Sequence, residues 1–407
     1  MRRQVIAAAM LVSLASLGDA APGLAEPPLE YSDTQLIPSM TVTERYDSNV
    51  FFIAGHNLED YVTTLTPKVQ LSHTGRLVTG TLGASLTNEL YAKNPNLNYV
   101  APSALLSADL TNLVRQLDKR AKLKVADTFT YSPRPVPFPG LVVGGNDATV
   151  FSRGIQTVRT NSTINAAQAE GAYELTPILS LDGKYLNSLY RTSTSLAGPG
   201  QNAFLFNTNF QTINVGPRVF VTSRDTVTMA YQYLRSDFSR ANVASSFQTH
   251  GATLGWTRVL APTLTASAMG GFTVFQGGNV QYLADAMLEW KYQRGATTVH
   301  YSRSVFPSFF IAGLPLLSQL VTVSASYNVT PSLTVLGSGS YAKNESVPNP
   351  ILSFESYAIT GSVTYTINRY FSAVASVTRS NYTSTFAATE SSFNRNVASL
   401  SLRGEWK

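Results

Sequence analysis

The side chains of this chain that could do chemistry are charged residues spaced an even number of positions apart. Asp285, Glu289 and Lys291 alternate with apolar neighbours, and Lys122 and Lys124 do the same. Because successive side chains of a strand point to opposite faces, this spacing places the charges on one face of a sheet and apolar groups on the other. A charged face of this kind can line a water-filled channel and influence which ions enter it.

Charges with this placement recur along the whole chain. Those predicted to face a polar interior are Arg45, Lys68, Lys122, Lys124, Lys184, Asp285, Glu289 and Arg403. Their basic excess would give a mild preference for anions. The alternative for any single one of them is a salt bridge with an acidic neighbour in the wall.

A long segment from Ser132 to Arg153 is the second candidate site. Alternate prolines stiffen its start, and a Gly-Gly-Asn-Asp sequence bends it. We expect this loop to fold inward and narrow the channel, with Arg134, Asp147 and Arg153 at the constriction, where charges set ion preference. The alternative is an external loop that faces neighbouring molecules or lipopolysaccharide.

A second segment, from Phe306 to Leu317, is unusually apolar for a loop. Exposed apolar patches usually contact something. Three possibilities are open: the segment tucks into the mouth of the fold, it contacts a neighbouring protomer, or it receives a hydrophobic solute.

Residues for catalysis or cofactor binding are sparse. The chain has no cysteine, which excludes disulfides and thiolate metal sites. The four histidines (His56, His73, His250, His300) are scattered without metal-ligand spacing, and no nucleotide-binding motif is present. We therefore expect no cofactor and no enzyme activity. The remaining catalytic alternative is His250 or His300 beside a serine on a neighbouring strand.

The elements that must position these residues are strands. Alternating segments are separated by short turns that recur about every 40 residues, as in an up-and-down barrel. Three turns share a Pro-centred sequence pattern, at Pro177, Pro262 and Pro331, each with an aromatic residue just upstream. A further short turn is predicted from Pro217 to Asp225. The sequence predicts an all-β, transmembrane, antiparallel up-and-down β-barrel of about eighteen strands, with sixteen as the alternative.

The C-terminal strand carries an apolar, outward-facing series that ends in an aromatic residue. Its members are Leu400, Leu402, Gly404 and Trp406. A strand of this kind is typical of outer-membrane barrels, and we predict that the barrel-assembly machinery recognises it.

The N-terminus has the features of a cleaved signal peptide. Arg2 and Arg3 precede an apolar run that is too short to span a membrane as a helix, and small residues follow it. Cleavage after Ala25 is preferred over cleavage after Ala20. The predicted organisation is signal peptide 1–25, periplasmic segment 26–34 and barrel 35–407.

The composition limits the partners. Charged residues make up 13% of the chain, against about 25% in an average soluble protein. Without Arg2, Arg3 and Asp19, 28 Lys and Arg oppose 23 Asp and Glu, a net charge of +5. This mild and dispersed charge makes nucleic acid an unexpected partner.

The stretches Thr41–Phe51 and Asp60–Pro67 resemble the first hairpin of outer-membrane β-barrel porins found with exopolysaccharide (PEP-CTERM-type) systems of Gram-negative bacteria. The resemblance implies an outer-membrane barrel linked to polysaccharide export, and it carries over no catalytic residue. Within the first stretch, Asp47-Ser48-Asn49 is a turn at the barrel rim or, alternatively, part of a ligand site.

The predicted function is passive passage of hydrophilic solutes through an outer-membrane pore, with a link to exopolysaccharide export. The alternatives are a closed scaffolding barrel of a secretion system, a transporter of hydrophobic compounds and, last, an outer-membrane enzyme. The expected partners are outer-membrane lipid, lipopolysaccharide, a polysaccharide and two further copies of the chain in a homotrimer.

Overall fold

The computed structural model describes residues 33–54, 58–135, 138, 150–155, 159–195, 206–240, 243–309, 314–386 and 389–406. The predicted signal peptide (1–25), residues 26–32 of the predicted periplasmic segment, His56 and Asp147 lie outside these residues.

The described part of the chain is almost entirely β-structure. The two helices in it are short: η1 (Pro95–Leu97) and α1 (Thr111–Val114). No helix in these ranges has the length and apolarity needed to span a membrane. The strands are β1 (Asp33–Asp47), β2 (Asp60–Thr74), β3 (Thr79–Tyr91), β4 (Tyr99–Asp109), β5 (Ala121–Ser132), β6 (Thr160–Thr176), β7 (Leu179–Ser195), β8 (Asn207–Phe220), β9 (Asp225–Arg240), β10 (Val243–Ala261), β11 (Leu264–Phe275), β12 (Val280–Tyr292), β13 (Gly295–Pro307), β14 (Pro315–Thr330), β15 (Leu333–Ser346), β16 (Leu352–Thr366), β17 (Phe371–Phe386) and β18 (Thr389–Glu405).

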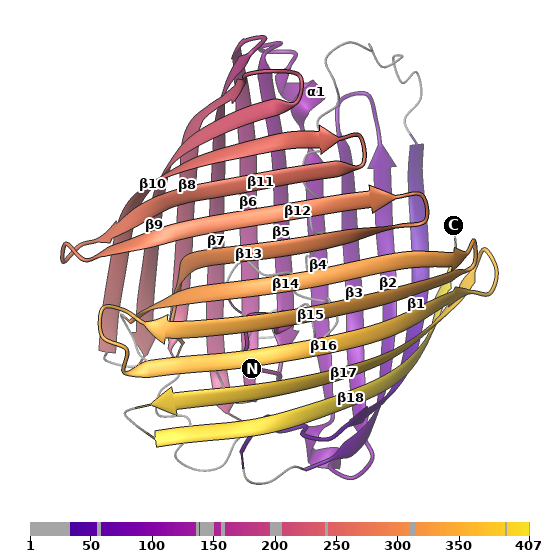
Figure 1. Cartoon of the computed structure of the whole chain (residues 1–407). Coiled ribbons are helices and arrows are strands. Elements are labelled where there is room, and N and C mark those ends of the chain that lie inside the picture. The colour runs from indigo at the N-terminus through magenta and orange to yellow at the C-terminus, as the bar shows by residue number, and fades with distance from the viewer. Residues whose placement is uncertain are drawn as a thin grey trace, which may run out of the picture.

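These strands form one closed sheet (Figure 1). Each strand pairs antiparallel with the strands before and after it in the chain, and β1 also pairs with β18. The closing ladder runs from Ser39 opposite Glu405 to Asp47 opposite Val397. The predicted up-and-down barrel is confirmed, with eighteen strands rather than sixteen.

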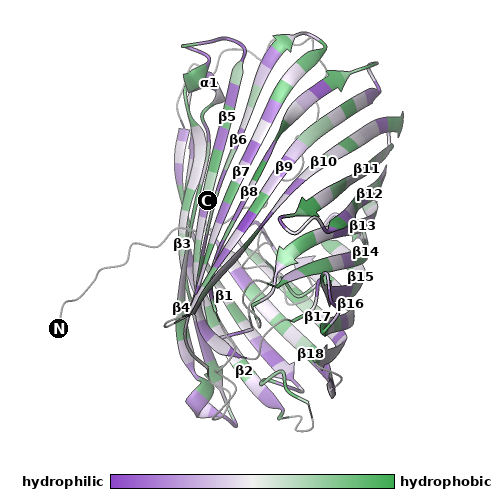
Figure 2. Cartoon of the chain, turned by 90° about the vertical axis from the view of Figure 1, so that its left-hand side faces the viewer, coloured by the Kyte–Doolittle hydropathy of each residue, from purple (hydrophilic) through white to green (hydrophobic). Residues whose placement is uncertain are grey.

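Hydropathy alternates along the strands (Figure 2). On β16 the outward positions include Tyr357, Ile359 and Val363, which are exposed, while Ser356 and Thr360 on the inward positions are buried. Large exposed apolar side chains occur on the outward positions of strands all around the barrel. An apolar outside and a polar inside form the pattern of a barrel that spans a membrane.

The short connections lie at the end of the barrel that also holds both described ends of the chain. At the three Pro-centred turns, two residues link β6 to β7, β10 to β11 and β14 to β15, as predicted. The register shifts just before each of these turns, between Glu174 and Thr176, Val259 and Ala261, and Asn328 and Thr330. We expected a turn from Pro217 to Asp225, but Pro217 pairs with Leu181 inside β8, so the turn covers only 221–224.

The C-terminal strand presents its predicted recognition residues outward. Leu400, Leu402 and Trp406 are exposed, and Phe371 packs edge-on against Trp406 with 6.2 Å between ring centroids. A Cβ at Gly404 would lie 3.0 Å from the Trp406 ring, so glycine allows this ring to lie flat on the strand. Recognition by the assembly machinery stays a prediction.

Candidate functional site in the barrel interior

Charge pairs line the half of the interior near the short turns. Ion pairs link adjacent strands, with nitrogen–oxygen distances of 2.6–3.5 Å, in Lys122–Glu174, Lys124–Asp109, Lys184–Glu170 and Arg218–Asp182. Each pair is partly exposed, so water reaches this half of the interior. The lysines on β5 and β7 that were predicted to face the interior are thus paired with acidic residues on the adjacent strands.

The other predicted interior charges lie on inward positions as well. His300 Nε2 on the next strand donates to Asp285 Oδ2 at 2.8 Å, and the Glu289 carboxylate lies 3.2 Å from Lys291 Nζ. Arg403 contacts Glu405 on β18. Lys68 lies in the same cross-strand row as Ser39 and Glu405.

The described residues of the segment that joins β5 to β6 (133–135, 138, 150–155 and 159) contact opposite walls of the barrel interior, and we call them the crossing segment. Arg153 belongs to this segment, and its guanidinium donates to Ser302 Oγ at 2.8 Å and Ser318 Oγ at 2.9 Å. These serines lie on β13 and β14, which stand opposite β5 and β6 in the closed sheet. Asn344 of β15 also donates to the Arg153 carbonyl at 2.8 Å.

Gly154 fixes the approach of this segment to the far wall. Its φ is +90°, which favours glycine, and a Cβ there would lie 2.9 Å from Ser356 Oγ. Glycine therefore allows both the turn and the close approach to β16.

The near anchorage of the crossing segment is the carboxylate of Glu89 on β3. Arg134 pairs with this carboxylate, Arg45 of β1 approaches it to 3.2 Å, and the Tyr91 hydroxyl donates to it at 2.7 Å. The Glu89 side chain is only 2% exposed. Two guanidinium groups thus share one buried carboxylate, which ties the start of the segment to the wall formed by β1 and β3.

A second buried ion pair lies beside the β1–β18 seam. Arg395 donates to both carboxylate oxygens of Asp47, at 2.6 and 2.9 Å, and its guanidinium lies 4.4 Å from the Phe52 ring centroid. Asn49 folds the following turn by donating to the Ile53 carbonyl at 2.9 Å. Asp47 and Asn49, from the stretch that resembles the porin hairpin, thus hold a turn at the rim.

Arg159 ends the crossing segment in an aromatic slot. Its guanidinium lies 4.8 Å from the ring centroid of Tyr91 and 5.7 Å from that of Tyr99. It donates to the carbonyls of Val50 and Leu97 at 3.2 and 3.4 Å. The side chain is fully buried, so its charge is balanced by ring faces and carbonyl dipoles.

The far anchorage of the crossing segment combines hydroxyls with aromatic rings. Phe306 lies under the Arg153 guanidinium at 4.7 Å and packs edge-on against Phe138 at 5.6 Å. Phe138 also joins Leu316, Leu352 and Phe354 in a buried cluster. Burial lowers the pKa of the Arg153 guanidinium to about 10, so the group is still charged at neutral pH.

The apolar segment after β13 points inward at its described residues. Phe309 is buried and packs at a tilt against Tyr190 with 4.6 Å between ring centroids, next to Ile164. Among the possibilities that the sequence left open, the described residues adopt the inward one.

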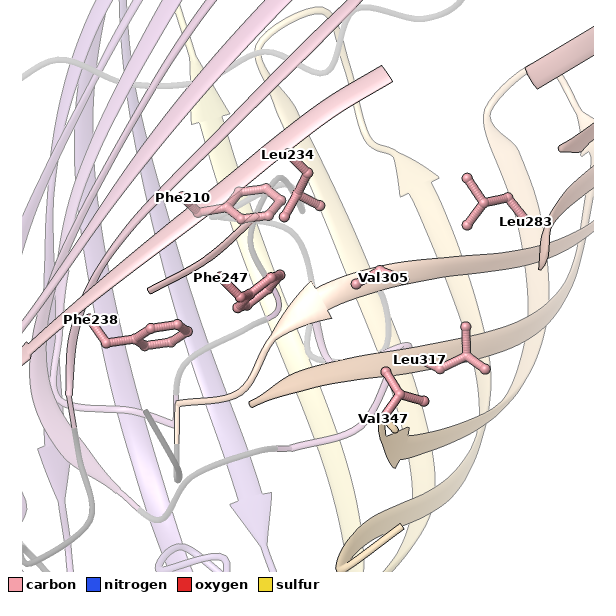
Figure 3. Close-up of a cluster of buried hydrophobic side chains, with 8 residues drawn as sticks. All are labelled: Phe210, Leu234, Phe238, Phe247, Leu283, Val305, Leu317 and Val347. Atoms are coloured by element: carbon pink, nitrogen blue, oxygen red, sulfur yellow. The ribbon is translucent and has the colours of Figure 1, made fainter. Parts of the chain in front are cut away.

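A larger apolar cluster covers part of the interior near the long connections (Figure 3). Inward positions of β8, β9, β10 and β12 contribute most of it, and the outer ends of β13 and β14 with the residue after β15 complete it. Its members are Phe210, Leu234, Phe238, Phe247, Leu283, Val305, Leu317 and Val347. The interior is therefore charged near the short turns and largely apolar on one wall near the long connections.

The predicted constriction residues do not form one cluster. Arg134 contacts Glu89 on the near wall, whereas Arg153 contacts Ser302 and Ser318 on the far wall. Asp147 lies outside the described residues. The constriction itself stays a prediction, now with two separated arginines.

Sequence reasoning missed Glu89 and Arg395 and gave Asp47 only as part of the rim turn, although alternation along β1, β3 and β18 places all three on inward positions. The signal that could have found them is a charged residue on an inward position, near the end of the strand that adjoins a long connection. Arg159 had no such signal, because its position depends on the path of the crossing segment. In the part of the chain that is described, no group of acidic and histidine side chains could hold a metal ion.

Comparison with known proteins gives a partial family match. Residues 280–405 match the family model "Putative beta-barrel porin 2". No curated protein matches the chain.

Several solved structures are similar over most of their length. Pseudomonas aeruginosa OccK5 (OpdH) is 12% identical, with 91% of this chain and 98% of that chain covered and a TM-score of 0.45. Acinetobacter baumannii OccAB3 is 10% identical, with coverage of 91% and 99% and a TM-score of 0.44. Pseudomonas aeruginosa OccK2 (OpdF) in complex with glucuronate is 9% identical, with coverage of 92% and 99% and a TM-score of 0.47.

Proposed function

We propose that the protein is an outer-membrane pore for passive passage of hydrophilic solutes, narrowed by the segment between β5 and β6. The observation that carries the proposal is the span of this segment from Glu89 on one wall to Ser302 and Ser318 on the other. A segment that reaches both walls acts as a bar that reduces the open cross-section of the barrel, and the charges on this bar act on passing ions.

The remaining interior supports aqueous passage. The half near the short turns carries partly exposed ion pairs, which keep water in this region. The location that we propose is the outer membrane of a Gram-negative bacterium, reached with a cleaved signal peptide and inserted by the barrel-assembly machinery. The outward apolar belt and the porin match over residues 280–405 support this location.

The test is planar-bilayer conductance of the refolded mature chain, residues 26–407. Stable open steps are expected, and Arg153→Ala should raise the single-channel conductance because the bar loses its hydroxyl bonds to the far wall. Arg258→Ala, at an exposed ion pair with Asp225, is the matched control and should leave the step unchanged. A folded barrel without steps would contradict the pore.

The link to exopolysaccharide export is the finer part of the proposal, and the first-hairpin resemblance supports it. Anionic oligosaccharide added to the bilayer chamber should block the open steps reversibly. The same concentration of a neutral oligosaccharide of equal length is the control. Equal blockade by both sugars, or none by either, would remove the charge-based link.

A second candidate function has its own observation, the apolar cluster in Figure 3. A wall of phenylalanine and leucine side chains suits a transporter of hydrophobic compounds better than a pore for sugars. Phe247→Asn should then abolish uptake of an apolar fluorescent solute into barrel-containing vesicles and leave ion conductance intact. Uptake equal to that of protein-free vesicles would reject this function.

A further inference from the structure

The wall of the barrel is split between the outer ends of β12 and β13, at the side of the long connections. Their ladder stops at Ala284 opposite Arg303, although β12 begins at Val280 and β13 continues to Pro307. The flanking ladders do continue, since β11 pairs with β12 up to Val280 and β13 pairs with β14 up to Pro307. No described residue of β12 before Ala284 pairs with β13, so two hairpins separate at this level.

A side chain replaces the missing backbone partner at the base of the split. Arg303 Nε donates at 3.1 Å to the Tyr282 carbonyl, which the ladder leaves without a backbone donor. A backbone carbonyl in a membrane wall needs a donor, which explains why the guanidinium lies there. Arg303 forms no ion pair with the part of the chain that is described, so its charge can act on another molecule at the edge of the split.

Beyond Arg303, the end of β13 bends into the barrel. Alternation gives Val305 the same outward position as Arg303, yet Val305 is only 6% exposed and belongs to one cluster with Phe247 and Leu283. Those two residues lie on inward positions of β10 and β12. Figure 3 shows the strand end that carries Val305 pointing toward Phe247. The outward face of this strand end therefore lies against the inner surface of the wall.

The split adjoins a lipid-facing surface on the outside and the apolar cluster of Figure 3 on the inside. Exposed apolar side chains occupy outward positions of β11 and β12, including Phe272, Val280 and Tyr282. Above the Arg303 bond, packing of Val305 into the cluster closes the split, and no ladder of the described strands crosses it. A hydrocarbon chain can take the place of such packing without breaking a backbone hydrogen bond.

The ladder between β4 and β5 also ends early, and its surroundings are different. These strands stop pairing at Ser103 opposite Thr130, but β5 itself ends at Ser132. The wall beside it holds the ion pair of the buried Glu89 carboxylate with Arg134. Buried charges do not favour a hydrocarbon chain. The apolar lining therefore distinguishes the β12–β13 split from this second early ladder end.

We propose that an acidic amphiphile with one hydrocarbon chain, such as a fatty acid, passes between the membrane and the barrel interior through the β12–β13 split. The inference rests on the second candidate function above, transport of hydrophobic compounds, and names its route and its solute. The hydrocarbon chain lies along Leu283, Val305 and Phe247. Arg303, at the lipid-facing edge, binds the carboxylate, because a guanidinium pairs with both oxygens of such a group.

The test uses a long-chain fatty acid with a photoreactive diazirine at the end of its chain, in vesicles that contain the refolded mature chain. Mass spectrometry maps the labelled residues. Label should reach Phe210 and Phe238 on inward positions, as well as lipid-facing residues. The chain has no cysteine, so Leu283→Cys with Val305→Cys allows a short bis-maleimide to lock the split. The cross-link should remove the interior label, and the same variant without cross-linker should keep it.

The matched control locks the same two strands where they are already paired. Leu288→Cys with Val299→Cys joins two exposed, directly opposed residues below the split, and its cross-link should leave the interior label unchanged.

A further variant tests the head group. Arg303→Gln keeps a donor for the Tyr282 carbonyl but loses the charge. Interior labelling by the fatty acid should fall about tenfold, because a hydrogen bond to a charged group is lost. Labelling by the alcohol of equal chain length should stay the same.

Three results would overturn the proposal: a wild type without interior label, interior label that survives the cross-link at the split, or its loss with the control cross-link. Equal loss of acid and alcohol labelling in Arg303→Gln would contradict the acidic head group. The labelling depends on neither solute uptake nor ion conductance. Interior label without uptake of an apolar solute would therefore reject the transport function and support the split, whereas uptake without interior label would reject the split alone.

Discussion

The segment that crosses the barrel is held by different chemistry at the two walls it reaches. At the near wall, which we call its near end, Arg134 shares the buried Glu89 carboxylate with Arg45, so opposite charges meet. At the far wall, which we call its far end, Arg153 meets two serine hydroxyls and the Phe306 ring, which are neutral. Removing one member of a buried ion pair leaves a buried charge, whereas hydroxyl bonds can be exchanged for water. The near end is therefore a permanent attachment and the far end a releasable one.

The largest effect is expected from Glu89→Gln. The change removes the carboxylate that two guanidinium groups share, and breaking a buried pair in this way costs about 3–5 kcal/mol. Denaturant unfolding of the barrel in detergent measures the loss. Glu59→Gln is the matched control, because its pair with Lys93 is half exposed and should leave the unfolding midpoint almost unchanged. Equal midpoints for both variants would contradict the permanent near attachment.

A smaller effect is expected from Asp47→Asn at the seam. The amide keeps the shape but loses the charge-assisted, two-oxygen contact with Arg395, which corresponds to about 2–3 kcal/mol. Because the pair stands beside the β1–β18 ladder, hydrogen exchange should rise first in the amides of 43–47 and 397–401. Uniform exchange over all strands would show that the pair supports the barrel as a whole instead.

Arg153→Met should separate the contribution of Arg153 to the stability of the barrel from its effect on single-channel conductance. Methionine fills similar space beside Phe306 and removes a buried charge, so the free energy of unfolding should change by no more than about 1 kcal/mol. The bar loses both hydroxyl bonds, so single-channel conductance should rise. Arg153→Lys, which keeps a charge near the serines, should raise conductance less. A large stability loss without a conductance change would make the far end structural.

The smallest effect is expected from acid at the exposed rim. Hydrogen bonds from Lys93 and Tyr46 lower the pKa of Glu59 below its usual 4.5. A carboxyl with a lowered folded-state pKa stabilises the fold above the unfolded value and loses that contribution as pH falls through the folded value. Local exchange at 46 and 59–61 should increase only below about pH 4.5. An increase at neutral pH would exclude the carboxylate as its cause.

Much of the fold could be predicted from the sequence, because barrel strands are short-range patterns. Alternation fixed the strand positions, and the Pro-centred turns at Pro177, Pro262 and Pro331 fixed the hairpins. The turn near Pro217 was placed wrongly, because proline is tolerated inside a strand where its position needs no amide donor. The alternation of side chains along a strand does not reveal which positions need an amide donor.

The interior site could be predicted only in part. Alternation predicted that each of these charged residues faces inward. Which residues meet across the barrel depends on a long connection, whose sequence does not alternate in this way. Arg134 and Arg153 were expected together and lie on opposite walls. Arg159, held by Tyr91 and Tyr99, has no sequence signature, because carbonyls and ring faces from three segments form its slot.

The seam between β1 and β18 has a consequence for biogenesis. Thr43 and Ser401 share a hydrogen bond across 358 positions of sequence, and the whole closing ladder is equally remote. Every other ladder joins neighbours in the chain, so hairpins can form as soon as they are synthesised, whereas closure must wait for the final strand. Until then the sheet has two open edges, each able to pair with another chain. A chaperone or an insertion machine must shield those edges, and a truncation that removes β18 should leave an aggregation-prone ribbon instead of a smaller barrel.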